Sequence, residues 1–324
     1  MKRLPTYSHR SQKQKTSSPN GHTIGYTAAG LNVLFWGIAP ILIKTGVMRV
    51  PPAVFLYYRF AIVVALTIPF IFLLKKVLHL PKKASAYWEL GLLGLISNPL
   101  NLLILFYGVR YTTSAASSII AALAPMVILV GSALFLREKI SRREIIGVFL
   151  ALIGTLFVVL ETPSQASASN PLLGNMLVLS YNIIWAMAVL WMKKRAQTYH
   201  PFLIGFSGWL VGLITCGLLV LFLHPSYFIP QTVFSDVPAM ISIGYMAVFG
   251  SLVAFTAYQV AQKFLDASEV GILTYLQPVV TLPLSIYFMH EKIGFPGLVG
   301  IALLILGVAV AELHMRVLKR THRK

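Results

Sequence analysis

The two halves of this chain of 324 residues repeat each other, and no other feature constrains its fold as strongly. One set of residues returns 149 positions later: Trp36, Lys44 and Pro52 match Trp185, Lys193 and Pro201. A second set returns 153 positions later: Pro125, Glu138, Lys139, Gly147 and Gly154 match Pro278, Glu291, Lys292, Gly300 and Gly307. Each half holds five apolar runs. Because five is odd, the halves must cross a membrane in opposite directions, which is typical of transporters that alternate access around a site between inverted repeats.

The apolar runs are each about 20 residues long, enough for a helix to cross a hydrocarbon core about 30 Å thick. Helices satisfy their own backbone hydrogen bonds, as a lipid environment requires. The runs are 24–44, 52–74, 87–108, 113–136, 142–160, 172–193, 201–223, 239–262, 269–289 and 294–315. We therefore expect an all-α integral membrane protein with ten transmembrane helices, in two inverted-topology repeats of five.

This arrangement divides the chain into five segments. The repeats are expected at 24–160 and 172–316, joined by an external linker at 161–171. Residues 1–23 and 317–324 are expected to be basic cytosolic tails, the first of them disordered.

The charge distribution agrees with a membrane protein. Charged residues make up 11% of the chain, against about 25% in soluble domains. Twenty-two of the 27 Lys and Arg residues fall on one side of the expected membrane, four fall on the other, and Arg59 lies within a span. The positive-inside rule then places both termini in the cytosol and the protein in the plasma (inner) membrane. The net charge of +18 has this explanation, not nucleic-acid binding, and the basic tails are suited to anionic lipid head groups.

Several kinds of chemistry have no sequence support. The single cysteine, Cys216, rules out a disulfide framework and a cysteine-based metal site. No P-loop, HExxH or glycine-rich nucleotide fingerprint is present, so we expect no catalytic residues, no metal and no cofactor. All nine acidic residues lie near span ends or in loops. A proton-driven antiporter usually needs a carboxylate within the membrane, so facilitated transport or exchange is favoured, with coupling through Tyr or loop residues left open.

Arg59 is the one charge placed well inside a span. It follows Pro52 by seven residues, about 10 Å into the membrane, where a charge costs about 3 kcal/mol. It should therefore face the bundle interior. Arg59 either binds a carboxylate or phosphate of a substrate, or cross-links helices through carbonyls or a Tyr. Its repeat counterpart is Gly208, so its role is not symmetric.

Each half also places an Asn about one turn before a Trp, in its first span. These pairs are Asn32 with Trp36, and Asn182 with Trp185. Because the pattern occurs twice, we favour a polar pocket with an aromatic wall over simple helix packing, which also uses polar side chains in membranes.

Prolines interrupt three further spans. Asn98, Pro99 and Asn101 predict a kink in the third span, either structural or lining a pocket. Ser251 and Tyr258 occupy the related stretch of the eighth span. Pro125 and Pro278 predict matching kinks in the fourth and ninth spans, as hinges or static bends. Tyr275 and Gln277 beside the second of these prolines are candidates to line the pathway.

The remaining repeated residues predict packing and loop structure. Gly147 and Gly154 are seven apart, as are Gly300 and Gly307, so each pair lies on one helix face and suits packing within the bundle or in a homodimer. Monomer and homodimer both remain open. Glu138 and Glu291 lie at span ends and are interpreted as residues that fix loops, in preference to coupling sites.

This combination resembles the EamA branch of the drug/metabolite transporter (DMT) superfamily. The shared features are ten spans in inverted halves, an early Trp in each half, and a Pro followed by a span-end Glu-Lys pair. Here those stretches run from Pro125 to Leu136-Arg137-Glu138-Lys139 and from Pro278 to Met289-His290-Glu291-Lys292. The resemblance covers about 24–316. It implies a central cavity lined by spans one to four and six to nine. Placed by span, the substrate-binding candidates are Asn32, Trp36, Arg59, Asn98, Asn101, Tyr107, Trp185, Tyr258 and Gln277.

The resemblance also implies the class of small-molecule substrate. Members of the family carry amino acids and other metabolites, often outward, and eukaryotic relatives carry sugar phosphates or nucleotide sugars. We therefore expect an amino-acid exporter in which Arg59 holds the substrate carboxylate. The alternatives are transport or exchange of nucleoside-type or phosphorylated metabolites, and multidrug efflux.

Overall fold

The computed structural model describes residues 19–78, 80–81, 83–121, 123–136, 142–159, 169–195, 198–265, 267–274, 276–291, 294–303, 305–307 and 310. Every regular element in these ranges is helical. The basic tails apart from residues 19–23, most of the linker, Glu138, Lys139, Tyr275 and Lys292 lie outside the described residues.

The first half contains long helices and shorter pieces that continue one another. They are α2 (Pro19–Val47), α3 (Pro52–Leu78), α4 (Ala84–Leu95), η1 (Ile96–Leu100), α5 (Asn101–Tyr111), α6 (Ser114–Ala121), α7 (Ala124–Gly131), η2 (Ser132–Leu136) and α8 (Arg142–Val159).

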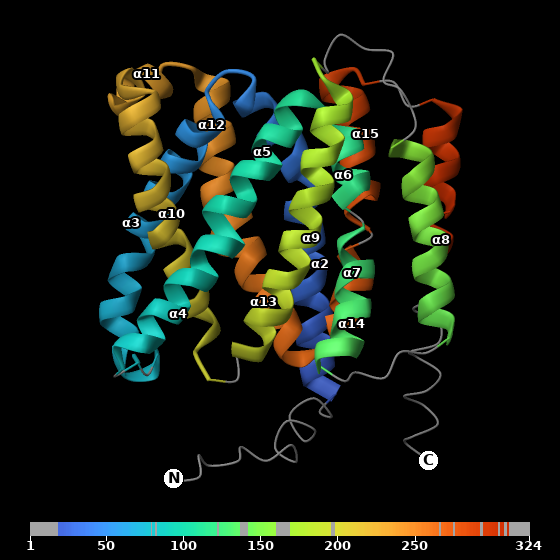
Figure 1. Ribbon diagram of the computed structural model, residues 1–324, viewed down its shortest axis with the longest axis horizontal. Helices are drawn as coiled ribbons and strands as arrows, with labels where there is room; N and C mark the ends of the chain where they lie inside the picture. Colours follow the sequence, from blue (N-terminus) through green and yellow to red (C-terminus); the bar gives the residue numbers. More distant parts are fainter. Residues whose placement is uncertain are drawn as a thin grey trace.

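The second half follows the same order, with two short extra helices before α12. Its elements are α9 (Pro171–Arg195), α10 (Pro201–Leu223), η3 (Pro225–Phe228), α11 (Pro230–Phe234), α12 (Val237–Tyr245), η4 (Met246–Val253), α13 (Ala254–Phe264), α14 (Ala267–Thr274) and α15 (Gln277–Met289). A further apolar helix covers Phe295–Gly307 and lies beside α8 (Figure 1).

The helices form an upright bundle in which the two halves interlock (Figure 1). The first helix of each half runs in the opposite direction to the other, α2 upward and α9 downward in this view. Helix α2 packs against α13 and α15 of the second half, while α9 packs against α5 and α7 of the first. Helices α3 and α10 pack against each other. Each half therefore completes its core with helices of the other half.

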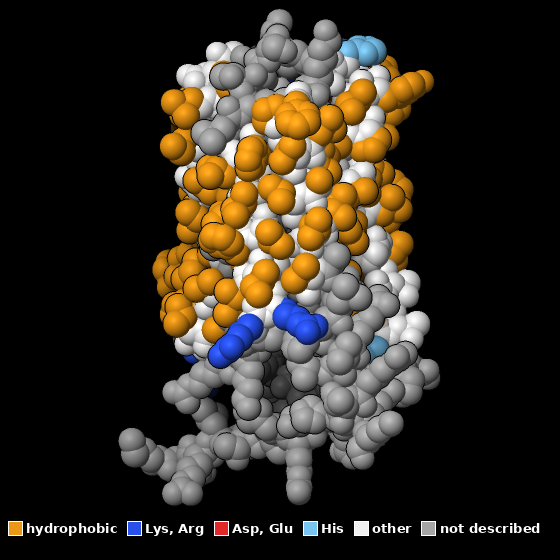
Figure 2. Space-filling view, turned by 90° about the vertical axis from the view of Figure 1, so that its right-hand side faces the viewer, with side chains coloured by type: hydrophobic (Ala, Val, Ile, Leu, Met, Phe, Trp, Pro, Cys, Tyr) orange, Lys and Arg blue, Asp and Glu red, His pale blue; other side chains and the backbone are white. Residues whose placement is uncertain are grey.

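The outside of the bundle is apolar. Leu73, Leu134, Leu172, Phe222 and Phe295 are each more than 70% exposed, which suits contact with lipid and not with water. Figure 2 shows hydrophobic side chains over the middle of one side, with the visible Lys and Arg side chains gathered toward its lower end. Among the described residues, six helices are long and apolar enough to cross a membrane.

The fourth and ninth expected spans are broken, not merely kinked. The break between α6 and α7 falls just before Pro125, and the break between α14 and α15 falls just before Pro278. Proline is tolerated in the first turn of a helix, where its missing N–H has no intrahelical partner to lose. Each proline therefore begins a second short helix, in place of bending one continuous helix as the sequence predicted.

The third and eighth spans each contain a π-helical segment, η1 and η4, at repeat-related places. In η1, Pro99 removes one N–H from the ladder, which favours the wider turn. Segment η4 has no proline; there the Ser251 hydroxyl donates to the Met246 carbonyl five residues earlier at 3.1 Å. Such π-helical turns occur often at functional sites.

Candidate functional site

Three of the residues predicted from sequence form one aromatic cluster between the halves. The Trp36 ring of α2 lies edge-on to Trp185 of α9, with centroids 5.8 Å apart. Tyr258 of α13 lies 5.3 Å from Trp36 and 5.9 Å from Trp185. These distances are typical of favourable aromatic pairs. The cluster therefore joins helices from both halves in the core of the bundle.

Helix α2 is held to the π-helical region of the eighth span by two side-chain bonds. The Trp36 indole donates from Nε1 to the Gly250 carbonyl at 3.0 Å. One turn earlier, the Asn32 amide donates from Nδ2 to the Ala254 carbonyl at 3.0 Å. Asn32 is 1% exposed and Trp36 is partly buried. These donors fix α2 against η4 and α13, so both residues have a structural role, and Trp36 also belongs to the cluster.

Asn182 on α9 reaches a different neighbour. Its Nδ2 donates to the Ile120 carbonyl of α6 at 2.8 Å, and its Oδ1 is buried without a partner. The Asn of each pair therefore makes one cross-helix bond, Asn32 to the eighth span and Asn182 to the fourth.

Arg59 of α3 is buried and bound through only part of its guanidinium. Its Nε donates to Ser251 Oγ at 2.9 Å, while its Nη1 is buried with no protein acceptor. The guanidinium carbon lies 5.9 Å from the Phe106 ring centre and 6.0 Å from that of Phe60. The helix cross-link expected as one alternative thus uses Nε, to a hydroxyl, and leaves Nη1 available.

Tyr181 of α9 is a site residue that sequence reasoning missed. It packs against the buried core and is near enough to both Arg59 and Tyr258 for electrostatic interaction with each. The signal was its position four residues before Trp185, which places both on one face of α9.

The repeat counterpart of Arg59 is a glycine that packs closely against the opposite helix. Gly208 of α10 lies against Asn98 of η1, and a Cβ at this glycine would lie 2.1 Å from Asn98 Nδ2. Asn98 is also the counterpart of Ser251, 153 positions earlier. One contact between the halves therefore joins a long Arg to a short Ser, and the equivalent contact fits a larger Asn against a Gly. The contact is symmetric in position and asymmetric in chemistry.

Three buried side chains of the bundle have unused hydrogen-bonding capacity. They are Arg59 Nη1, Asn182 Oδ1 and both polar atoms of the Asn101 side chain, which is fully buried at the start of α5. A buried polar group without a partner costs about 1–3 kcal/mol. Retaining several of them is reasonable where a ligand or water supplies the missing partners.

The other predicted lining residues come from α5 and α15. Tyr107 on α5 and Gln277 at the start of α15 are partly buried. The Gln277 carbonyl lies close to Gly37, the neighbour of Trp36, where a Cβ would come within 3.1 Å. Pro278 is buried in the first turn of α15, and Pro125 lies in the first turn of α7. Gly147, Gly154, Gly300 and Gly307 are buried in the two peripheral helices.

One end of the bundle is fixed by two buried charges that frame the turn between α5 and α6. Lys44 Nζ donates to the carbonyls of Val109, Arg110 and Thr112 at 3.1, 3.1 and 2.6 Å. The carboxylate of Glu291 accepts from the backbone N–H groups of Ser114 and Ala115 at 2.9 Å each. The prediction that Glu291 fixes a loop is confirmed.

The acidic residues are less exposed than their positions at span ends suggested. Glu269 is 1% exposed and accepts from the Tyr26 hydroxyl at 3.3 Å, while Glu291 is 3% exposed. Both carboxylates lie at span ends, where the sequence placed them, and neighbouring helices bury them there. Among the described residues, no three His, Cys, Asp or Glu side chains group so as to hold a metal ion.

Comparisons with known proteins identify related sequences. The model of the EamA-like transporter family matches residues 23–160 and, a second time, residues 172–312. An uncharacterized transporter of Archaeoglobus fulgidus is 27% identical over 283 residues, which cover 86% of this chain and 95% of that protein. A Salmonella typhimurium protein named "Probable amino-acid metabolite efflux pump" is 26% identical over 299 residues, covering 90% of this chain and 96% of that protein.

A solved structure shares the fold. A chain described only as "Crystal structure of protein" superimposes with a TM-score of 0.68 and 21% sequence identity. The match covers 93% of this chain and 99% of the other. At this identity the likeness is one of fold alone.

Proposed function

Because this chain belongs to the EamA-like transporter family, with two copies of the family domain, we propose that it exports amino acids by alternating access between its two halves. That it is a multi-pass membrane transporter follows from the family and from its apolar helices. The substrate, the direction of transport and the mechanism are the proposal.

The proposed architecture is ten membrane crossings in two inverted repeats, 24–160 and 172–316. Its support is the opposite direction of α2 and α9 and the reciprocal packing of each on the other half. In this count, the short helices α6 and α7 together make one membrane crossing, and α14 and α15 together make another. The proposed location is the plasma membrane with both termini in the cytosol, and the excess of Lys and Arg on one side supports this orientation.

The observation that carries the substrate proposal is the unpaired Nη1 of Arg59. The Ser251 hydroxyl donates to the Met246 carbonyl, so toward Arg59 it can only accept, and it holds Nε while Nη1 stays available. A guanidinium is always charged and binds carboxylates well. A substrate carboxylate would accept the hydrogen bond that Arg59 Nη1 leaves unused, near the aromatic cluster.

Two further unpaired groups suit the other end of an amino acid. Asn182 Oδ1 and Asn101 Oδ1 are buried acceptors without partners, which an ammonium group would satisfy. Trp36, Trp185 and Tyr258 offer apolar faces for a side chain and for cation–π contact. A substrate with several phosphate charges would need more cations than one guanidinium supplies. The Salmonella relative named as an amino-acid metabolite efflux pump supports the same class.

Counterflow in proteoliposomes tests the proposal. Vesicles are preloaded with unlabelled amino acids, nucleosides or sugar phosphates, and entry of labelled substrate is followed with and without a pH gradient. We expect saturable exchange of one amino-acid class, lost in Arg59→Ala and weakened in Arg59→Lys, which keeps the charge but not the fork geometry.

The controls separate substrate class from protein damage. Arg142→Gln removes an exposed cation of α8 and should leave exchange unchanged. Exchange of phosphorylated solutes without exchange of amino acids would replace the proposal by its alternative. Exchange of amino acids that survives in Arg59→Ala would remove the carboxylate role of Arg59.

A further inference from the structure

We propose that two ion pairs, Arg49 with Asp236 and Arg195 with Glu89, act as latches that alternately hold the two ends of the transporter closed. The inference rests on the proposed alternating access between halves. Each pair joins one half to the other, and the pairs lie at opposite ends of the bundle: α2 ends and α12 begins at one, α9 ends and α4 begins at the other (Figure 1).

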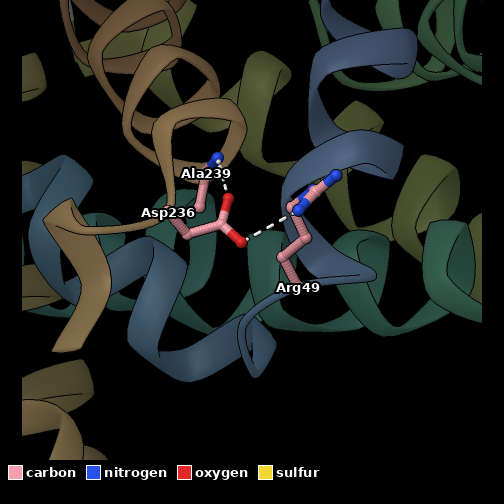
Figure 3. A network of polar contacts seen from close by, with 3 residues as sticks. All are labelled: Arg49, Asp236 and Ala239. Carbon is pink, nitrogen blue, oxygen red and sulfur yellow. Dashed lines mark hydrogen bonds and ion pairs between the residues drawn. The ribbon is translucent and has the colours of Figure 1, made fainter.

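The first latch lies at the end of the bundle expected to be external. Arg49, in the turn between α2 and α3, donates from Nη1 to Asp236 Oδ2 at 2.9 Å (Figure 3). The other carboxylate oxygen of Asp236 accepts from the Ala239 backbone N–H at 2.9 Å and so caps α12. Asp236 therefore ties the start of the eighth span to the end of the first span.

The second latch lies at the cytosolic end. Arg195, the last residue of α9, pairs with Glu89 near the start of α4. The Tyr199 hydroxyl donates to the second oxygen of Glu89 at 3.2 Å. Burial and the neighbouring Glu89 carboxylate raise the pKa of Tyr199, so the hydroxyl remains a donor at neutral pH.

The two latches occupy equivalent places in the repeats. Each joins the end of the first span of one half to the start of the third span of the other half. An inverted repeat exchanges the conformations of its halves when access alternates. Contacts at equivalent places should then be formed and broken in turn. Both are formed in this structure, so both ends are held closed.

The strength of the pairs suits a latch. Their side chains are between 24% and 46% exposed, so water screens them and they can part readily. An exposed ion pair shifts an equilibrium by about two- to five-fold. That is enough to bias which end is closed and too little to lock it.

Disulfide reporters test the latches without any substrate. In a Cys216→Ser background, Arg49→Cys with Asp236→Cys reports closure of the outer end, and Arg195→Cys with Glu89→Cys reports closure of the inner end. Each reporter is combined with loss of the opposite latch: Glu89→Gln with the outer reporter, and Asp236→Asn with the inner one. Asparagine retains the cap on α12 while removing the charge.

We expect each loss to raise the cross-linking rate at the far end by about two- to five-fold, because freeing one end favours closure of the other. Lys194→Gln, which removes an exposed cation next to Arg195, should leave the outer reporter unchanged. The latches are overturned if the far reporter does not respond, if both variants slow both reporters, or if a reporter pair does not cross-link at all.

The outcomes separate this inference from the proposed function. If the reporters respond but the counterflow assay finds no exchange of any amino acid, the latches are upheld and the proposed substrate class is rejected. Amino-acid exchange with unresponsive reporters would do the reverse.

Discussion

Arg59 Nε donates to Ser251 Oγ at 2.9 Å and thereby joins α3 of the first half to the π-helical segment η4 of the second. The same hydroxyl donates to the Met246 carbonyl at 3.1 Å, so its proton is committed and it can only accept from Arg59. This polarity fixes which guanidinium nitrogen is used by the protein and which is left unpaired.

Removing the hydroxyl of Ser251 should weaken substrate binding more than turnover. In Ser251→Ala, Arg59 Nε becomes a buried donor without a partner, at a cost of about 1–3 kcal/mol, and its guanidinium is free to rotate. We expect the KM for counterflow to rise about ten-fold with a smaller change in maximal rate.

Ser251→Thr is the matched control, because it keeps the hydroxyl and should restore most of the affinity. Equal losses of affinity in the Ala and Thr variants would mean that packing at η4, not the bond to Arg59, determines the effect.

The glycine that corresponds to Arg59 should be intolerant of any side chain. In Gly208→Ala, the new Cβ would come within 2.1 Å of Asn98 Nδ2 and 2.9 Å of its Cγ. Overpacking of this kind costs about 1–3 kcal/mol, so the thermal midpoint in detergent should fall by several degrees.

The same contact predicts a specific rescue. Asn98→Ser shortens the opposing side chain and should recover most of the loss when combined with Gly208→Ala, giving a clear coupling term in a double-mutant cycle. Additive effects of the two substitutions would show that the clash is relieved elsewhere.

Periodic patterns in the sequence identified much of this site. The repeated Trp residues predicted a shared aromatic cluster, and Trp36 and Trp185 do meet, 5.8 Å apart. Arg59 stood out because a charge within a span must be compensated. These features depend on residue type and spacing alone, which a single sequence displays.

Other parts depend on which helices become neighbours, which spacing does not reveal. Lys44 resembled a loop cation, yet it is 4% exposed because α5 ends beside it. Tyr181 had no sequence feature apart from its helical phase with Trp185. The breaks before Pro125 and Pro278 were predicted as kinks, because proline is compatible with both a bend and a helix start.

Lys44 and Glu291, which bind the two sides of the turn between α5 and α6, should each contribute to the thermal stability of the bundle. In Glu291→Gln, two backbone N–H groups and the Ser114 hydroxyl lose a charged acceptor. Hydrogen bonds to charged groups contribute about 1.5–3 kcal/mol, so we expect a clear fall in thermal midpoint. Lys44→Met leaves three carbonyls without their donor and should have a similar effect.

Because Lys44 and Glu291 hold the two sides of one turn, their substitutions should not be additive. The double variant should lose less stability than the two single losses combined, as the turn is already disordered in either one. Full additivity in thermal unfolding would show that the two charges fix the bundle independently.

The ion pair at the outer end should be insensitive to pH over the physiological range. The bond from the Ala239 backbone N–H and the pairing with Arg49 hold the pKa of Asp236 below its ordinary value of 3.8. Since the folded pKa is lowered, the stabilisation is fully present above the ordinary value and is lost as the pH falls through the folded one. Asp236→Asn keeps the cap and removes the charge, so it isolates this contribution. We expect the difference in thermal midpoint between the wild-type protein and Asp236→Asn to stay constant from about pH 8 to pH 5, and to shrink only below about pH 3.8. A difference that already changes between pH 5 and pH 8 would assign the titration to another group and remove Asp236 as its source.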